Sequence, residues 1–384
     1  MVSKDFFLGE DVYLDSACVS LRPKIVFDAE CRYQQELFSC ASRSAHKKAN
    51  QVTREVAAAR KYLHTFFSAS RKQSLLFTKN ATESLNVVAQ CLLLKQADVI
   101  ITSFKEHNSN HLPWLREAKR SGCKHFLLSA QPDIDLGELE ELLHSHKGKR
   151  IILSLVHVSN VDGSVLDVKR VSKLAKKYGA FFVLDACQSA SHMPVTASLA
   201  DVVVASGHKM LGPSVGLLIA PTKWLEQTDP LLLGGSTVVS SSKDDYTYAD
   251  LPEKFEAGLQ NYSGIIGLQE AAKYLSNYGL KNVAKHCQKL HDQVRDAFVH
   301  DKRILFHGQG AVCSFEVPGV DAQEVALLLN EHGILLRAGQ HCAHTYFSHI
   351  NKEGFVRASF HLYTSDEDIN AFITALKDVL EVVC

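Results

Sequence analysis

A lysine stands between two stretches that have the sequence of buried strands, in the segment SGHK (206–209). Residues 202–204 are three valines, and residues 216–220 form a second apolar run, Gly-Leu-Leu-Ile-Ala. Continuous apolar runs of this kind are typical of strands that are covered on both faces. Lysine is almost never buried without a partner, so the ordinary interpretation of Lys209 is a solvated residue in a hairpin loop. The rest of the chain favours a chemical role.

Other polar residues also follow predicted strands. Asp185 ends FFVLD, Asn160 follows LSLVHVS and His107 follows VIITSFKE, while Thr82 begins a predicted helix just after LLFTK. In an open parallel sheet, ligands bind beyond the carboxyl ends of the strands. We therefore expect these side chains to meet Lys209 at one edge of the sheet.

This set of side chains matches the needs of pyridoxal 5′-phosphate (PLP). A lysine amine forms a Schiff base with an aldehyde, and a carboxylate such as Asp185 holds the pyridine nitrogen protonated. A helix N-terminus with hydroxyls binds a phosphate, which the turn at 80–82 supplies together with Ser206 and His208. A hydrogen-bond donor should face the phenolate oxygen, and Gln188, one turn past Asp185, is the candidate. Taken singly, Asp185 fits a helix cap or a loop acid, and His107 fits a surface histidine; the combination favours a PLP site.

The bulk composition excludes several classes of protein. The chain has 384 residues, 46% of them hydrophobic, with 42 Lys+Arg against 42 Asp+Glu. A formal net charge of zero offers no basic surplus for nucleic acid or anionic membrane. No apolar run is long enough for a membrane span, and the acidic start does not resemble a signal peptide, so we expect a cytoplasmic protein. Ten cysteines occur without a C-x-x-C pair, so we expect neither a metal site nor a disulfide framework.

The predicted elements alternate through the first two thirds of the chain. Strands are expected at 74–79, 98–103, 124–129, 150–159, 180–186 and 201–206, and helices at 81–94, 110–122, 133–148 and 167–179. Such alternation predicts an α/β fold with a mostly parallel sheet covered on both faces. Residues 231–258 are predicted to form a long functional or interface loop, and 263–301 a long helix with a break near Gly279.

The remaining sequence predicts a small α+β domain. Its strands are expected at 311–318, 334–339 and 354–360, and its helices at 321–333 and 365–383, the last opened by a Ser365…Asp368 capping pattern. We expect three parts: a segment 1–20 that joins the small domain or an interface, a large PLP-binding domain 21–265, and a connecting helix with the small domain, 266–384.

Several motifs resemble, in order, those of class V aminotransferases, and among them the SufS-type cysteine desulfurases and selenocysteine lyases. These motifs are YLDSA (13–17), TKNATESLNVVA (78–89), EHNSNHLPW (106–114), SGHKMLGP (206–213), RAGQHCAH (337–344) and VRASFHLYTSDEDI (356–369). The resemblance covers nearly the whole chain. It implies the PLP-dependent transferase fold type I and a homodimer.

The resemblance also implies a role for each matching residue. Lys209 would be the Schiff-base lysine and His107 the catalytic histidine that stacks on the ring. Asp185 would pair with the pyridinium and Gln188 with the phenolate, while Thr82, Ser206 and His208 would hold the phosphate. Asn160 and Arg357 would bind the substrate carboxylate, Arg337 would line the pocket, and Cys342 would accept sulfur.

Cys342 is the cysteine whose surroundings favour chemistry. It lies in a polar turn between His341 and His344, whereas most other cysteines lie in apolar helices or strands, where a thiol behaves as a small buried hydrophobe. Two departures from the family pattern also stand out: Ala81 and Leu259 replace residues that are usually threonines. Both remove a hydroxyl from the expected phosphate site, which predicts weaker retention of PLP.

We predict a PLP-dependent L-cysteine desulfurase that yields L-alanine and a persulfide on Cys342, for transfer to a sulfur-acceptor protein in iron–sulfur cluster assembly or other sulfur metabolism. A selenocysteine lyase acting on L-selenocysteine, or another PLP-dependent C–S lyase, remains an alternative because the fold alone does not choose the substrate. A catalytically weak relative that serves as a partner-binding subunit is the alternative outside catalysis.

Overall fold

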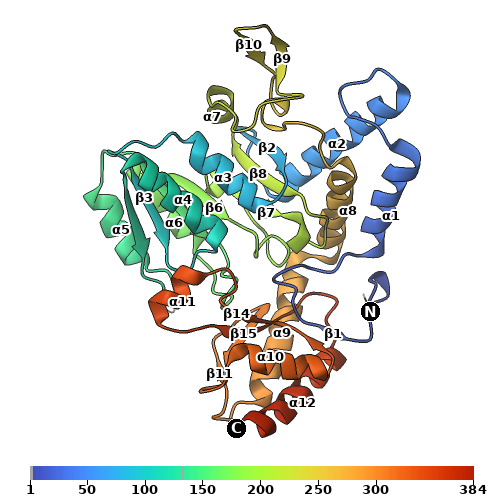
Figure 1. Ribbon diagram of the computed structural model, residues 1–384, viewed down its shortest axis with the longest axis vertical. Helices are drawn as coiled ribbons and strands as arrows, with labels where there is room; N and C mark the ends of the chain where they lie inside the picture. The colour runs from blue at the N-terminus through green and yellow to red at the C-terminus, as the bar shows by residue number, and fades with distance from the viewer. Residues whose placement is uncertain (1–2, 132) are drawn as a thin grey trace.

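The central feature of the molecule is a seven-stranded sheet (Figure 1). The structure is a computed structural model that describes residues 3–131 and 133–384. The strands follow the order β2-β8-β7-β6-β5-β3-β4. They are β2 (Gln73–Thr78), β3 (Val99–Ser103), β4 (Lys124–Leu128), β5 (Ile151–Val156), β6 (Phe181–Asp185), β7 (Val202–Ser206) and β8 (Gly216–Pro221). Strand β8 runs opposite to the other six strands, which are parallel to one another, and this confirms the predicted mostly parallel sheet.

Helices cover both faces of this sheet, as the continuous apolar strands predict. Neighbouring residues of one strand enter different hydrophobic cores: Ile101 of β3 packs in one and Ile100 in the other. The second core is closed by α3 (Ala81–Cys91) and α4 (Asn108–Ser121). The first core is closed by α2 (Lys47–Phe66), α5 (Leu136–Ser145), α6 (Val168–Tyr178), α8 (Tyr262–Tyr278) and α9 (Leu280–Ala297). Two further helices are α1 (Lys24–Arg32) and α7 (Thr222–Gln227).

The helix break predicted near Gly279 is confirmed. Helix α8 ends there and α9 begins at the next residue, with Gly279 at φ 89°. A left-handed φ is cheap only for glycine, so the chain can change direction between two long helices at this point. Helix α5 begins three residues later than the predicted 133, because Asp135 caps it by accepting hydrogen bonds from the backbone N–H groups of Gly137 and Glu138.

A second, four-stranded antiparallel sheet forms the C-terminal region, in the order β11-β12-β15-β14. Its strands are β11 (Leu305–Phe306), β12 (Val312–Glu316), β14 (Arg337–Gly339) and β15 (Phe355–Ser359), with helices α10 (Ala322–Glu331), α11 (His344–Ile350) and α12 (Asp366–Val383). The capping box predicted at Ser365 and Asp368 is confirmed. The prediction of one strand over 334–339 is wrong. Residues Ile334–Leu335 form β13, which pairs with β1 (Val12–Tyr13), whereas β14 pairs with β15, so the two halves serve different sheets.

The N-terminal segment lies against this C-terminal region (Figure 1). After β1, Asp15 bridges to Ser359, and Ser16 Oγ lies 2.7 Å from the hydroxyl of Tyr363. The segment therefore reaches the space between the two sheets. Residues 1 and 2 of the predicted 1–20 part lie outside the described residues, and the domain boundaries stay a prediction.

The stretch 231–258 is more ordered than the predicted loop. It contains an antiparallel hairpin, β9 (Val238–Ser241) and β10 (Tyr246–Tyr248), which projects from the top of the molecule in Figure 1. The short 3₁₀ helix Glu253–Phe255 follows the hairpin. Within the described part of the chain, no helix has the length and apolar character needed to cross a membrane.

Candidate active site

A cavity of about 210 Å³ opens where β5, β6 and β7 end and the C-terminal region covers them. Every site residue predicted from the sequence lines it: Thr82, His107, Asn160, Asp185, Gln188, Ser206, His208, Lys209, Arg337, Cys342 and Arg357. The structure thus brings together side chains that are spread over most of the chain. Their individual roles stay predictions. Among the described residues, no group of three or more His, Cys, Asp or Glu side chains is arranged to hold a metal ion.

Lys209 reaches the cavity because the chain turns sharply after β7. The 3₁₀ helix Gly207–Lys209 follows Ser206 directly, and Gly207 N donates to Val215 O at 2.8 Å to close the connection to β8. A Cβ on Gly207 would lie 2.4 Å from Pro213 O, so only glycine fits at the turn. The lysine between two buried strands is therefore not a solvated hairpin residue; it lines the cavity at the carboxyl end of the sheet.

Asp185 is the buried carboxylate of the cavity, at the end of β6. Its Oδ1 accepts a hydrogen bond from Cys187 N at 3.0 Å. A second carboxyl, Glu106, is buried nearby and accepts hydrogen bonds from Ser103 and Asn110. Burial, and to a smaller extent the charge of Asp185, raises the pKa of Glu106 to about 8, so Glu106 holds its proton at neutral pH.

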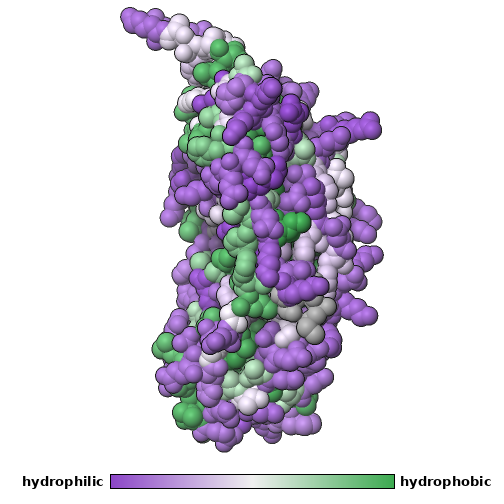
Figure 2. Space-filling view, turned by 90° about the vertical axis from the view of Figure 1, so that its right-hand side faces the viewer, coloured by the Kyte–Doolittle hydropathy of each residue, from purple (hydrophilic) through white to green (hydrophobic). Residues whose placement is uncertain are grey.

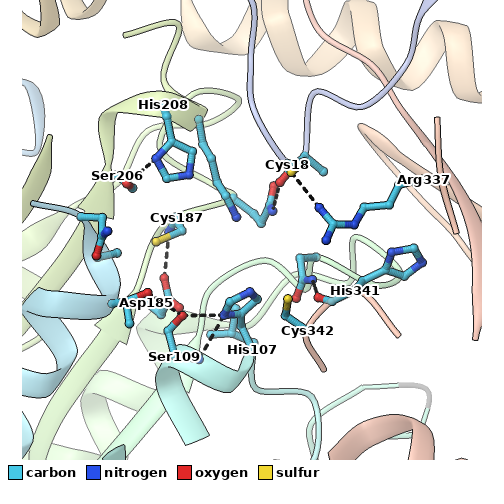
Figure 3. A pocket seen from close by; sticks show the side chains of 18 of the residues that line it. Cys18, His107, Ser109, Asp185, Cys187, Ser206, His208, Arg337, His341 and Cys342 are labelled. Atoms are coloured by element: carbon cyan, nitrogen blue, oxygen red, sulfur yellow. Dashed lines mark hydrogen bonds between the residues drawn. The ribbon is translucent and has the colours of Figure 1, made fainter. Parts of the chain in front are cut away.

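His107 caps helix α4 and is connected to α3 by hydroxyl groups (Figure 3). Its Nδ1 accepts from the Ser109 backbone N–H at 3.1 Å and from Ser109 Oγ at 2.6 Å, and Thr82 Oγ1 donates to Ser109 Oγ at 3.0 Å. Burial, followed by the charge of Lys209, lowers the pKa of His107 to about 3. The ring is therefore neutral. Because Nδ1 is an acceptor, the single ring proton lies on Nε2.

The start of α3 forms the part of the cavity suited to an anion. Asn80 caps this 11-residue helix by accepting from Glu83 N at 3.0 Å, and Ala81 and Thr82 open its first turn. Ser206 Oγ and His208 Nδ1 lie 2.8 Å apart on the adjacent strand end. Burial lowers the pKa of His208 to about 4, so its ring is neutral as well. The helix N-terminus and two hydroxyl-bearing side chains, Thr82 and Ser206, all line the cavity and are groups suited to a phosphate.

Arg357 and Asn160 both line the cavity, and each has a buried polar atom without a partner among the described residues. Arg357 is 2% exposed; its Nη2 donates to Asp15 at 3.0 Å and its Nη1 to Asn160 O at 2.9 Å. Asn160 Nδ2 donates to His341 O at 2.7 Å. Within the described residues, Arg357 Nε and Asn160 Oδ1 have no hydrogen-bond partner. A buried donor and a buried acceptor left open are costly, unless a polar ligand completes them.

Cys342 lies in a tight turn between β14 and α11. Both His341 and Cys342 adopt left-handed backbone, at φ 48° and 56°. Two consecutive non-glycine residues in this region are rare, so the turn needs support. Cys342 O accepts from Asn108 N at 2.6 Å, His341 O accepts from Asn160, and His341 Nε2 lies 3.0 Å from Phe355 O. These contacts hold the turn between segments that follow strands of the large sheet and β15 of the C-terminal sheet.

Several cavity residues escaped the sequence predictions. Ser109 lies between two motif residues of EHNSNHLPW, but nothing in its own surroundings marked it. Cys18 and Cys187 also line the cavity. Gln188 Nε2 donates to Ala17 O at 2.8 Å, so one of its amide hydrogens is already used. The sequence does not reveal that these residues line the cavity, because this depends on contacts between distant segments and on the direction of each side chain.

Comparisons with known proteins identify the family of the chain. The family model for aminotransferase class-V matches residues 12–372. The chain belongs to the class-V aminotransferase family. It is 34% identical to a probable cysteine desulfurase of Pyrococcus abyssi over 99% of this chain and 97% of that protein. It is also 34% identical to the cysteine desulfurase CsdA of Escherichia coli, over 97% of this chain and 94% of that protein.

Solved structures of relatives share the fold over the full length. The apo cysteine desulfurase of Thermococcus onnurineus has a TM-score of 0.94 and 34% identity, covering 100% of this chain and 98% of that one. E. coli CsdA in its S-sulfonic acid form has a TM-score of 0.92 and 33% identity with the same coverage. The predicted fold class, a type I PLP-dependent transferase fold with a mostly parallel sheet, is confirmed.

Proposed function

We propose that this chain is a PLP-dependent L-cysteine desulfurase, which converts L-cysteine to L-alanine and leaves the sulfur as a persulfide on Cys342. The observation that carries the proposal is a thiol, Cys342, lining one small cavity with Lys209 and the buried Asp185. A class-V aminotransferase that moved only amino groups would not need a thiol there.

The cavity has the donors and acceptors that PLP requires. Lys209 would attach the aldehyde, Asp185 would pair with the pyridine nitrogen, and Gln188 retains one amide hydrogen for the phenolate oxygen. Thr82, Ser206 and His208 would hold the phosphate at the N-terminus of α3, and His107 would stack on the ring. When bound, PLP supplies an electron sink that lets the substrate lose its α-proton and weakens the bond between Cβ and sulfur.

The unpaired atoms of Arg357 and Asn160 support an amino-acid substrate. Arg357 Nε is a charged donor suited to a carboxylate, and its other guanidinium nitrogens are already held by Asp15 and Asn160 O. Asn160 Oδ1 is an acceptor suited to an N–H group. Binding L-cysteine here satisfies buried groups that otherwise reduce stability, and it fixes the orientation of the substrate.

The remaining residues act on protons and on sulfur. Lys209 Nζ takes the α-proton, and His107, which is neutral with its proton on Nε2, serves as a hydrogen-bond donor. The Cys342 sulfur attacks the substrate sulfur. The bond between Cβ and sulfur breaks, the sulfur stays on Cys342, and the carbon skeleton leaves as alanine after protonation. A partner protein would then accept the persulfide sulfur.

We also propose that the chain acts as a homodimer. Figure 2 shows hydrophobic side chains gathered in a band on the face that carries α1. Exposed large apolar residues concentrate in two stretches: Phe7, Leu8, Val19, Ile25, Phe27 and Phe38, and Leu231, Leu232, Leu233, Val239, Tyr246 and Leu259. Large exposed apolar areas of this kind mark interaction surfaces. A monomer that stays fully active at low concentration, by light scattering and assay, would refute the dimer.

The proposed function is tested with purified protein, PLP and L-cysteine. We expect visible absorption of bound PLP, release of alanine, and a persulfide on the Cys342 peptide. Release of pyruvate and ammonia would indicate an eliminating C–S lyase. Turnover of L-selenocysteine without turnover of L-cysteine would indicate a selenocysteine lyase, and absence of PLP binding would indicate a partner-binding subunit. Placement in the cytoplasm stays a prediction.

A further inference from the structure

The cavity contains a second thiol that the proposed function does not use. Cys18 and Cys342 both line it and both are partly exposed. Cys18 Sγ accepts a hydrogen bond from Arg337 Nη1 at 2.8 Å (Figure 3). Arg337 begins β14, the strand that leads directly into the turn holding Cys342. The Cys18 sulfur therefore contacts a residue five positions before Cys342 on the same segment, and both thiols line one cavity.

The position of Cys18 is fixed by contacts with both halves of the molecule. Its backbone N–H donates to Asp15 O at 3.0 Å, and the preceding residue, Ala17, donates to Ser359 Oγ at 2.9 Å. Gln188, from the large sheet, donates to Ala17 O at 2.8 Å. The negative charge of Asp15 is paired with Arg357 at 3.0 Å. Asp15 thus pairs with Arg357, whereas the Cys18 sulfur contacts a different guanidinium, that of Arg337.

Cys187 is the third thiol of the cavity, and its surroundings differ from those of Cys18. Loss of solvation, followed by the nearby Asp185, raises the pKa of Cys187 well above its ordinary value, so Cys187 stays protonated. Nucleophilic cysteines occur in partly exposed, electropositive surroundings. Cys187 lies beside a carboxylate, whereas Cys18 contacts a guanidinium. Arg357 and Asn160 line the same cavity as these thiols, and each keeps one buried polar atom, Nε and Oδ1, without a hydrogen-bond partner among the described residues.

We propose that Cys18 is a second sulfur-accepting residue, which takes the outer sulfur from the persulfide of Cys342. This inference rests on the proposed function. The Cys18 thiolate attacks the outer sulfur atom, a new S–S bond forms at Cys18, and the S–S bond at Cys342 breaks. Cys342 leaves as a thiolate, and the persulfide proton moves with the outer sulfur. One disulfide-type bond replaces another, so no oxidant or reductant is consumed, and Cys342 becomes free for another turnover.

The test follows persulfides on individual peptides. Holoenzyme is incubated with L-cysteine, quenched with a thiol-alkylating reagent and digested, and each cysteine peptide is examined by mass spectrometry for one added sulfur atom. We expect added sulfur on the Cys342 and Cys18 peptides. We expect none on Cys187, whose thiol stays protonated beside Asp185, and none on Cys31, which is exposed and controls for non-specific transfer.

Two variants establish the route. In Cys18→Ser, the Cys342 peptide should still gain sulfur. In Cys342→Ala, the Cys18 peptide should lose its added sulfur, because the proposed route passes through Cys342; equal labelling of Cys18 in this variant would overturn the route. Sulfur on Cys342 without sulfur on Cys18 overturns the inference and leaves the proposed function intact. Sulfur on Cys31 as abundant as on Cys18 also overturns the inference. Absence of alanine and of sulfur on every peptide refutes the proposed function itself.

Discussion

The cavity has two walls, and they are built differently. On the sheet wall, Asp185 and Ser206 occupy the last positions of neighbouring parallel strands, whose register places Asp185 beside Val204, two residues before Ser206. On the C-terminal wall, Cys342 lies in a turn of left-handed residues, and Arg357 is held by Asp15 and by Asn160. The sheet wall presents the groups suited to PLP, and the C-terminal wall presents those suited to the substrate's carboxylate and sulfur. The difference suggests that cofactor retention and sulfur transfer can be disrupted separately.

Removal of Lys209 should have the largest effect. Lys209→Ala deletes the group that attaches PLP and moves the α-proton, so we expect turnover to fall by about 10²–10⁴-fold or more. Bound PLP should be lost on dialysis, as measured by its visible absorption. Lys169→Ala, an exposed position on α6, is the matched control and should retain both properties. An unchanged absorption band in Lys209→Ala would show that Lys209 does not attach PLP.

Removal of the Cys342 thiol should leave the binding of PLP by the sheet wall unchanged. We expect Cys342→Ala to retain PLP, measured by absorption after dialysis, but to lose most conversion of cysteine to alanine and to carry no persulfide at position 342. Activity on L-selenocysteine should survive better, because selenium leaves more readily. Cys31→Ala, at an exposed site, is the control. Wild-type turnover in Cys342→Ala would mean that this thiol only packs.

Removal of the Ser109 hydroxyl should have a smaller effect, because this group only helps to orient His107. Ser109→Ala removes the 2.6 Å contact with Nδ1 and leaves the backbone N–H contact. One hydrogen bond is worth about 1 kcal/mol, so we expect kcat to fall by about fivefold with KM little changed, and Ser109→Thr to restore it. Steady-state kinetics on L-cysteine measure this. Equal kcat in Ser109→Ala would show that the backbone contact alone positions the ring.

The smallest effect is expected from a substitution that adds a hydrogen bond to the phosphate of PLP. Ala81→Thr adds a hydroxyl at the first residue of α3, where the phosphate of PLP is proposed to bind. We expect PLP to be held more tightly, by about 1 kcal/mol if one hydrogen bond forms. Parallel dialysis of the two proteins, followed by absorption, compares their retention. Equal retention would mean that Thr82, Ser206 and His208 already satisfy the phosphate.

The two walls also differ in how far the sequence alone predicts them. Strand ends can be located from apolar runs, so the order of residues is enough to place Asp185 and Lys209 at one edge of the sheet. The contact between Cys18 and Arg337 joins residues 319 positions apart, and no local pattern encodes it. The prediction of one strand over 334–339 was wrong for the same reason, because its two halves pair with strands from opposite ends of the chain. The family resemblance located Cys342, and only the structure shows the turn that presents it.

The most direct test is the fate of L-cysteine in the purified holoenzyme, with carbon and sulfur followed together. The account predicts that alanine accumulates, that pyruvate and ammonia do not, and that the Cys342 peptide carries an added sulfur atom before any acceptor is supplied. Alanine formation in step with free sulfide, with Cys342 unmodified throughout, would contradict it.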